Sequence, residues 1–124
     1  MREFTAIQER YLRDAAPIRL GGIAANLARI TSFSHHDANR EVVERMLDES
    51  KWFIEWTAPE MDPDTAAALV ELQLQLAQWQ AHWARIWLET EQRQAVMEQA
   101  RSWSQRILEM SGLLHEDLSN HKMA

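Results

Sequence analysis

The sequence contains no cysteine, only three glycines and three prolines, and no long apolar run. Without cysteine the chain forms no disulfide, binds no metal through thiolates and has no thiol nucleophile. The scarcity of glycine and proline indicates long helices joined by few turns. No apolar run approaches the roughly 20 residues of a membrane span, and the charged start Met1-Arg2-Glu3-Phe4 does not resemble a signal peptide. We therefore expect a cytoplasmic protein with no membrane association.

Positive charge is scarce over the larger part of the chain. The net charge is −6, and residues 57–124 hold ten acidic side chains against five basic ones. Residues 1–34 have the opposite balance, with five arginines against three acids. Nucleic-acid binding depends on neutralising backbone phosphates with lysine and arginine. We therefore expect no nucleic-acid partner.

The spacing of apolar residues predicts an all-α protein. A chain of 124 residues fits one domain and buries roughly two-thirds of the surface that its unfolded form exposes. We expect a single helical-bundle domain over residues 1–124, with 115–124 as a frayed polar tail. The predicted architecture is an up-and-down bundle of about four helices, preceded by a short N-terminal helical segment. The four helices are expected over approximately residues 17–33, 37–57, 63–88 and 92–111.

Local signals place several helix ends. Asp62 followed by Pro63 is typical of a helix start, and Gly112 of a helix stop. Ser34-His35-His36-Asp37 has the pattern of a capping box. Near Glu89 the apolar phase changes, which predicts a tight turn there. Pro17 and Gly21-Gly22 leave open whether residues 3–33 form one kinked helix or two consecutive helices.

The predicted helix over residues 63–88 carries two apolar seams rather than one. The first consists of Thr65, Leu69, Leu72, Leu76, Trp79, Trp83 and Ile86. The second lies roughly 140° around the helix and consists of Val70, Leu74, Ala77, Ala81, Ala84 and Leu88. A helix that is apolar over so much of its circumference contacts either two neighbours in the bundle or one neighbour and a partner chain.

Six tryptophans provide the remaining candidate sites. Trp52 and Trp56 fall off the predicted core face of residues 37–57, and tryptophan is enriched in interface hot spots. They are therefore candidate interface residues for a homodimer or for another protein partner. Trp79, Trp83 and Trp103 are candidates to line a pocket for a hydrophobic small molecule. The alternative interpretation of these three rings is that they fill the core.

The sequence supplies no convincing metal or catalytic site. His35-His36-Asp37 has suitable ligand types, but adjacent residues rarely point the same way, so we interpret it as a solvated turn. His82 is preceded at a spacing of three by Gln78, a poor substitute for a bridging carboxylate. His115 and His121 lie in the polar tail. No serine has the sequence context of a nucleophile elbow. We expect no metal, no cofactor and no catalytic residues.

Arg29 followed by His35 or His36 resembles the Arg-x4-6-His signature of the HEPN family of helical ribonucleases. The resemblance covers these positions only, and Ile30 stands where the family has a polar residue. It implies that Arg29 polarises a scissile phosphate while His35 shuttles a proton. Ribonuclease activity is accordingly the second alternative function.

Three stretches resemble a group of small uncharacterised proteins common in cyanobacteria. They are ESKWFIEWTAP at residues 49–59, QWQAHW at residues 78–83 and LEMSG at residues 108–112. The resemblance implies no activity for any residue. The leading hypothesis is a non-enzymatic, self-associating helical interaction module, because of the two-seamed helix and the position of Trp52 and Trp56. A carrier or sensor of a hydrophobic small molecule is the first alternative.

Overall fold

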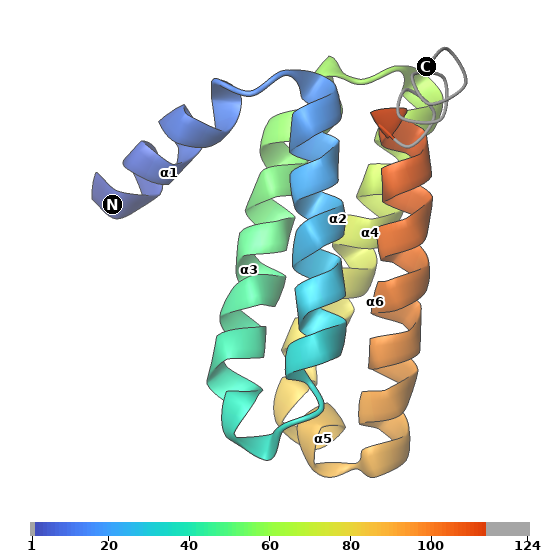
Figure 1. Ribbon diagram of the computed structural model, residues 1–124. Helices are drawn as coiled ribbons and strands as arrows, with labels where there is room; N and C mark the ends of the chain where they lie inside the picture. The colour runs from blue at the N-terminus through green and yellow to red at the C-terminus, as the bar shows by residue number, and fades with distance from the viewer. Residues whose placement is uncertain (1, 114–124) are drawn as a thin grey trace, which may run out of the picture.

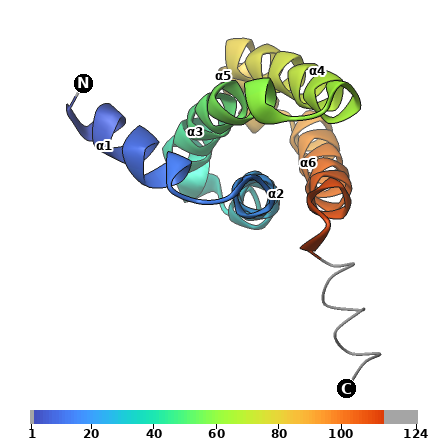
Figure 2. The ribbon, with the colours of Figure 1, turned by 90° about the horizontal axis from the view of Figure 1, so that it is seen from above.

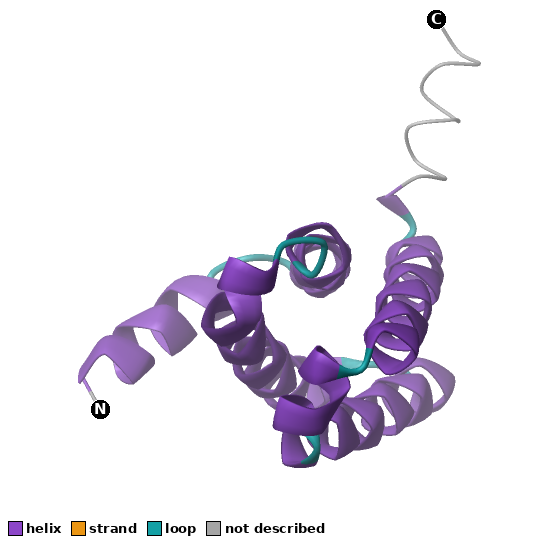
Figure 3. Cartoon of the chain, turned by 90° about the horizontal axis from the view of Figure 1, so that it is seen from below, coloured by secondary structure: helices purple, strands orange, loops and turns teal. Residues whose placement is uncertain are grey.

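The computed structural model describes residues 2–113, with side chains from Thr5 onward, and these residues form helices and short connections without a strand (Figures 1 and 3). The predicted tail over residues 115–124 lies outside the described part. The α-helices are α1 (Arg2–Leu12), α2 (Ala16–Phe33), α3 (Arg40–Thr57), α4 (Pro63–Ala81), α5 (Trp83–Leu88) and α6 (Thr90–Ser111). Short 3-10 helices precede and follow α3, at Asp37–Asn39 and Ala58–Glu60.

Four long helices, α2, α3, α4 and α6, run alternately down and up (Figure 1). Seen along the bundle, they surround a common centre, while α1 projects sideways next to α3 (Figure 2). The predicted all-α, up-and-down bundle is confirmed. Residues 3–33 form two helices rather than one kinked helix, with Pro17 in the first turn of α2. Proline is tolerated there because the first helical N–H groups have no intrahelical partner.

The core is built from the predicted apolar faces. The first seam of residues 63–88 is buried from Leu69 to Ile86, and its counterparts on the other helices are buried with it. The core positions are Leu20, Ile23, Ala24, Leu27, Ile30, Val43, Leu47, Ile54, Leu69, Leu72, Leu76, Trp79, Trp83, Ile86, Trp87, Val96, Ala100 and Ile107.

Small residues allow α2 and α6 to pack closely. The Ser104 hydroxyl donates to the carbonyl of Ala24 at 2.7 Å, and the Thr31 hydroxyl donates to the carbonyl of Met97 at 3.0 Å. A Cβ at Gly21 would lie 2.9 Å from the Leu113 side chain. The close approach of Leu113, just after the end of α6, therefore accounts for Gly21. Among the four neighbouring pairs of long helices, α4 and α6 are the least closely packed.

Two of the three helix-end predictions are confirmed. The Asp62 carboxylate accepts from the Thr65 N–H at 3.1 Å, and Gly112 ends α6 with a left-handed backbone, φ 77°. The predicted capping box at Ser34 is wrong. The Ser34 hydroxyl donates instead to the carbonyl of Ile30, and so satisfies an acceptor at the end of α2 rather than a donor at the start of α3.

The predicted continuous helix over residues 63–88 is divided in two. The backbone at His82 leaves the helical region (φ −115°, ψ 19°), so α4 ends at Ala81 and α5 begins at Trp83. After the break, the indole N–H groups of Trp83 and Trp87 donate to the carbonyls of Arg40 and Asp37, both at 3.2 Å. These bonds attach α5 to the first residue of α3 and to the short 3-10 helix before it. The predicted turn near Glu89 is confirmed, since Glu89 is extended between α5 and α6.

A polar network holds the N-terminal helix against the bundle. The guanidinium of Arg19, only 5% exposed, is ion-paired with Glu60 and donates to the carbonyls of Asp14 and Trp56. The Tyr11 hydroxyl donates to the carbonyl of Arg19. The network thereby joins the connection between α1 and α2 to the end of α3.

Candidate functional site

The most unusual surface of the bundle is the outer face of α4. Val70 and Leu74 are 48% and 68% exposed, although both are large apolar side chains. With the smaller residues next to them they form a continuous line with alternating spacings of three and four. We call this line the outer stripe; it consists of Ala67, Val70, Leu74, Ala77 and Ala81. Beyond the break, Ala84 and Leu88 continue the spacing on α5, and Leu88 is 78% exposed.

The outer stripe is the α4 part of the second seam predicted from the sequence, extended by Ala67. The sequence predicted that this seam contacts either a second helix of the bundle or a partner chain. Val70 and Leu74 are exposed, so no second helix of the bundle covers them. Isolated exposed leucines are normal on protein surfaces and need no explanation. A line of apolar side chains at heptad spacing is different, because that arrangement is what two helices use to pack against each other.

Polar side chains border the outer stripe on both sides. On the α3 side, the Gln73 amide donates to Glu55 at 3.0 Å, and Gln80 accepts from Lys51 at 2.7 Å. On the α6 side lie two adjacent hollows between α4 and α6. One is lined by Glu71, Gln75, Gln99, Ser102, Trp103 and Arg106. The other is lined by Gln75, Gln78, Trp79, His82, Arg85, Ile86, Gln92, Ala95, Val96 and Gln99.

The predicted interface residues Trp52 and Trp56 belong to an aromatic cluster between α1 and α3. Tyr11 stacks on Phe53 with ring centroids 4.3 Å apart and also contacts Trp56 at 5.7 Å. Trp52 lies 6.1 Å from Trp56 and is 39% exposed. Part of the aromatic surface that the sequence assigned to a partner is thus in contact with the chain's own N-terminal helix.

The three tryptophans predicted to line a ligand pocket have different surroundings. Trp83 is 2% exposed and packs against Trp87 with ring centroids 5.4 Å apart. Trp79 and Trp103 line separate hollows of the α4–α6 side, and the guanidinium of Arg106 covers the Trp103 ring at 4.6 Å. The structure therefore does not bring the three rings together around one described hollow.

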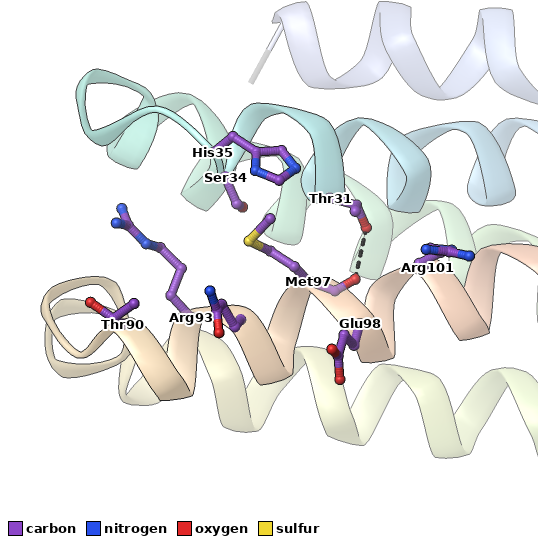
Figure 4. Close-up of a pocket in the computed structure, with 9 residues that line it drawn as sticks. Thr31, Ser34, His35, Thr90, Arg93, Met97, Glu98 and Arg101 are labelled. Carbon is purple, nitrogen blue, oxygen red and sulfur yellow. Dashed lines mark hydrogen bonds between the residues drawn. The ribbon is translucent and has the colours of Figure 1, made fainter.

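A further hollow, of about 420 Å³, lies between the end of α2 and the first half of α6 (Figure 4). It is lined by Thr31, Ser34, His35, Thr90, Arg93, Gln94, Met97, Glu98 and Arg101. Arg93 pairs with Asp37 at 2.8 Å and lies 4.6 Å above the Trp87 ring. The hydroxyls of Thr31 and Ser34 already donate to main-chain carbonyls. The hollow thus offers basic side chains to a ligand but no free hydroxyl for nucleophilic chemistry at these two positions.

The structure places the remaining predicted residues apart. Arg29 donates to Asn26 at 2.8 Å and lines a hollow near the start of α2, whereas His35 lines the hollow of Figure 4. The pair that resembles the ribonuclease signature is therefore not assembled around one described hollow. Within the described residues, no group of three or more metal-ligating side chains is close enough to hold an ion. His115 and His121 lie outside these residues.

Sequence reasoning named Trp52 and Trp56 as interface candidates and did not name Val70 and Leu74. The signal for these two residues was present, since both belong to the second seam. The seam supported the self-association hypothesis, but its residues were not assigned to the interface, because periodicity identifies an apolar face without saying what covers it. Arg19 and Arg93 were also missed, because their partners Glu60 and Asp37 lie 41 and 56 positions away in the sequence.

No family model, curated protein or solved structure matches the chain significantly. The class of protein is therefore defined by the fold alone: an all-α, up-and-down four-helix bundle with an additional N-terminal helix. Among the described helices, none is both long and apolar enough to cross a lipid bilayer.

Proposed function

We propose that the protein is a non-enzymatic helical module that associates with a second copy of itself through the outer stripe of α4. The observation that supports this proposal is the exposure of Val70 and Leu74 at 48% and 68%, in line with three alanines at heptad spacing. Burying a leucine side chain contributes about 1.5 to 3 kcal/mol. A helix that leaves such side chains in water gains this stabilisation when it meets a matching face.

The alanines of the outer stripe favour another helix as the occupant. Alanine at contact positions on both sides of Val70 and Leu74 lets two helix backbones approach closely, while the valine and leucine supply the apolar area. A small-molecule site would instead require a concave, enclosed apolar pocket. The outer stripe is a convex helix surface, which fits a protein partner better than a small ligand.

The experiment compares Leu74→Lys with the wild type by sedimentation velocity over a range of concentrations. We expect wild type to form a dimer and Leu74→Lys to weaken it at least about tenfold, because a buried apolar contact is lost and two charges are brought together. The melting temperature should barely change, since Leu74 is exposed in the single chain.

Ile18→Lys is the matched control, because Ile18 is 51% exposed and lies on α2, away from the outer stripe. It introduces the same charge and should leave association unchanged. A wild-type protein that sediments as a monomer at every concentration would exclude the proposal. Equal weakening by both variants would show that net charge, and not the outer stripe, controls association.

A further inference from the structure

Two charged side chains stand at equal sequence distances from Gln78, one on α4 beside the outer stripe and one on α5 beyond the break at His82. Between Thr65 and Leu88, Glu71 and Arg85 are the only residues with a formal charge when His82 is neutral. Glu71 precedes Gln78 by seven residues, and Arg85 follows it by seven. Neither forms an ion pair within the described part of the chain.

Both charges also lie on the same flank of the outer stripe. Glu71 shares a hollow with Gln75 and Gln99, and Arg85 shares the adjoining hollow with the same two glutamines. This flank faces α6. The opposite flank, towards α3, carries Gln73 and Gln80, which are already hydrogen-bonded to α3.

We infer that two copies of the chain pair α4, together with the α5 that follows it, antiparallel about a two-fold axis near Gln78, with Glu71 of each copy beside Arg85 of the other. This inference rests on the proposed self-association and specifies its geometry. A two-fold axis perpendicular to the helices places a residue a given distance before Gln78 opposite one the same distance after it. It also places the α6-facing flanks of the two copies on the same side of the interface. The acidic group of one copy therefore meets the basic group of the other.

A parallel arrangement fits the same surface less well. In a parallel pair, Glu71 would lie beside Glu71 and Arg85 beside Arg85, so both contacts would be repulsive. About an axis near Gln78, residues 75–81 of the two α4 helices overlap and residues 68–73 face the partner's α5, so the contact falls at the small end of specific interfaces. We therefore expect a reversible dimer with a dissociation constant in the micromolar range, in which two charge pairs matter for the choice of geometry.

The absence of cysteine makes disulfide trapping a direct test. In Gln78→Cys, the two introduced thiols lie next to the axis. We expect their Cβ atoms to be about 3.5–4.5 Å apart there, which is the Cβ separation of a disulfide. Ala67→Cys is the matched control on the same helix. Its symmetry mate would be 22 residues further along the paired helices, about 33 Å away. We expect mild oxidation to cross-link Gln78→Cys and to leave Ala67→Cys uncross-linked.

Charge reversal gives a second readout. We expect Glu71→Arg and Arg85→Glu each to weaken the dimer by about tenfold, and the double variant to restore it to within about threefold of wild type. Efficient cross-linking of Ala67→Cys would indicate parallel pairing and overturn the inference. A dimer that cross-links at neither position and ignores both reversals would overturn it while leaving self-association intact. A monomeric wild type would instead contradict the proposed function itself.

Discussion

The hydroxyl groups of Tyr11 and Thr57 lie 2.7 Å apart, although 46 positions separate the two residues in the sequence. The Tyr11 hydroxyl also donates to the carbonyl of Arg19, which leaves Thr57 as the donor in the Tyr11–Thr57 hydrogen bond. Thr57 is fully buried at the end of α3, and the Tyr11 ring stacks on Phe53. Together with the ring stacking, this hydrogen bond anchors α1 to the bundle.

The anchor makes stability sensitive to alkaline pH. Burial raises the pKa of Tyr11 from 10.0 to about 12, partly offset by the hydrogen bond from Thr57 and the nearby Arg19 charge. Between these two values the unfolded chain releases the phenol proton while the folded chain retains it, so the folded state loses stability as the pH rises. The stabilisation is complete below pH 10 and should fall by about 2 to 3 kcal/mol by pH 12.

Chemical denaturation at a series of alkaline pH values measures this loss. Tyr11→Phe is the control, because it keeps the stacked ring and removes the ionising group. Its unfolding free energy should lack the extra decline above pH 10. Tyr11 is the only tyrosine in the chain, so the absorbance of tyrosinate reports on this group alone. A phenol that titrates near pH 10 in the folded protein would contradict the prediction.

Trp52→Ala distinguishes the outer stripe from the aromatic cluster as the interface. If the chain associates through α4, this change should alter the dimer dissociation constant by less than about twofold. It should lower the unfolding free energy by about 1 to 2 kcal/mol, since Trp52 packs on Trp56 but is 39% exposed. Sedimentation and denaturant titration measure the two quantities separately. If the free energy of dimerisation fell by more than the unfolding free energy, the result would support Trp52 as an interface residue.

The two adjacent glycines of α2 should respond differently to alanine. A Cβ at Gly22 would be 4.0 Å from the Tyr11 ring, an ordinary contact, whereas a Cβ at Gly21 would be 2.9 Å from Leu113. Alanine is favoured over glycine within helices by about 1 kcal/mol. We therefore expect Gly22→Ala to raise the unfolding free energy by about 0.5 to 1 kcal/mol. Gly21→Ala should gain less, because Leu113 must move; equal gains in thermal or chemical denaturation would refute this difference.

The sequence by itself determined the helices and their buried faces. Periodicity at Leu69, Leu72 and Leu76, the cap at Asp62 and the stop at Gly112 act within one or two helical turns, so they are readable from neighbouring residues. The exceptions were also local. The apolar spacing continues through His82 in the sequence, so periodicity gave no sign of the helix break there. At Ser34 the pattern predicted a hydroxyl that caps the next helix, whereas the hydroxyl donates to the carbonyl of Ile30 in its own helix turn.

The tertiary structure alone decided which surfaces remain open. Residues 63–88 carry two apolar seams, and either was available to face the core. The positions of α2, α3 and α6 determine that Leu72 is buried and Leu74 exposed. The partners of Arg19 and Tyr11 likewise come from the far end of α3 and the turn after it. Apolar periodicity is a property of one helix, whereas burial depends on the helices that pack around it.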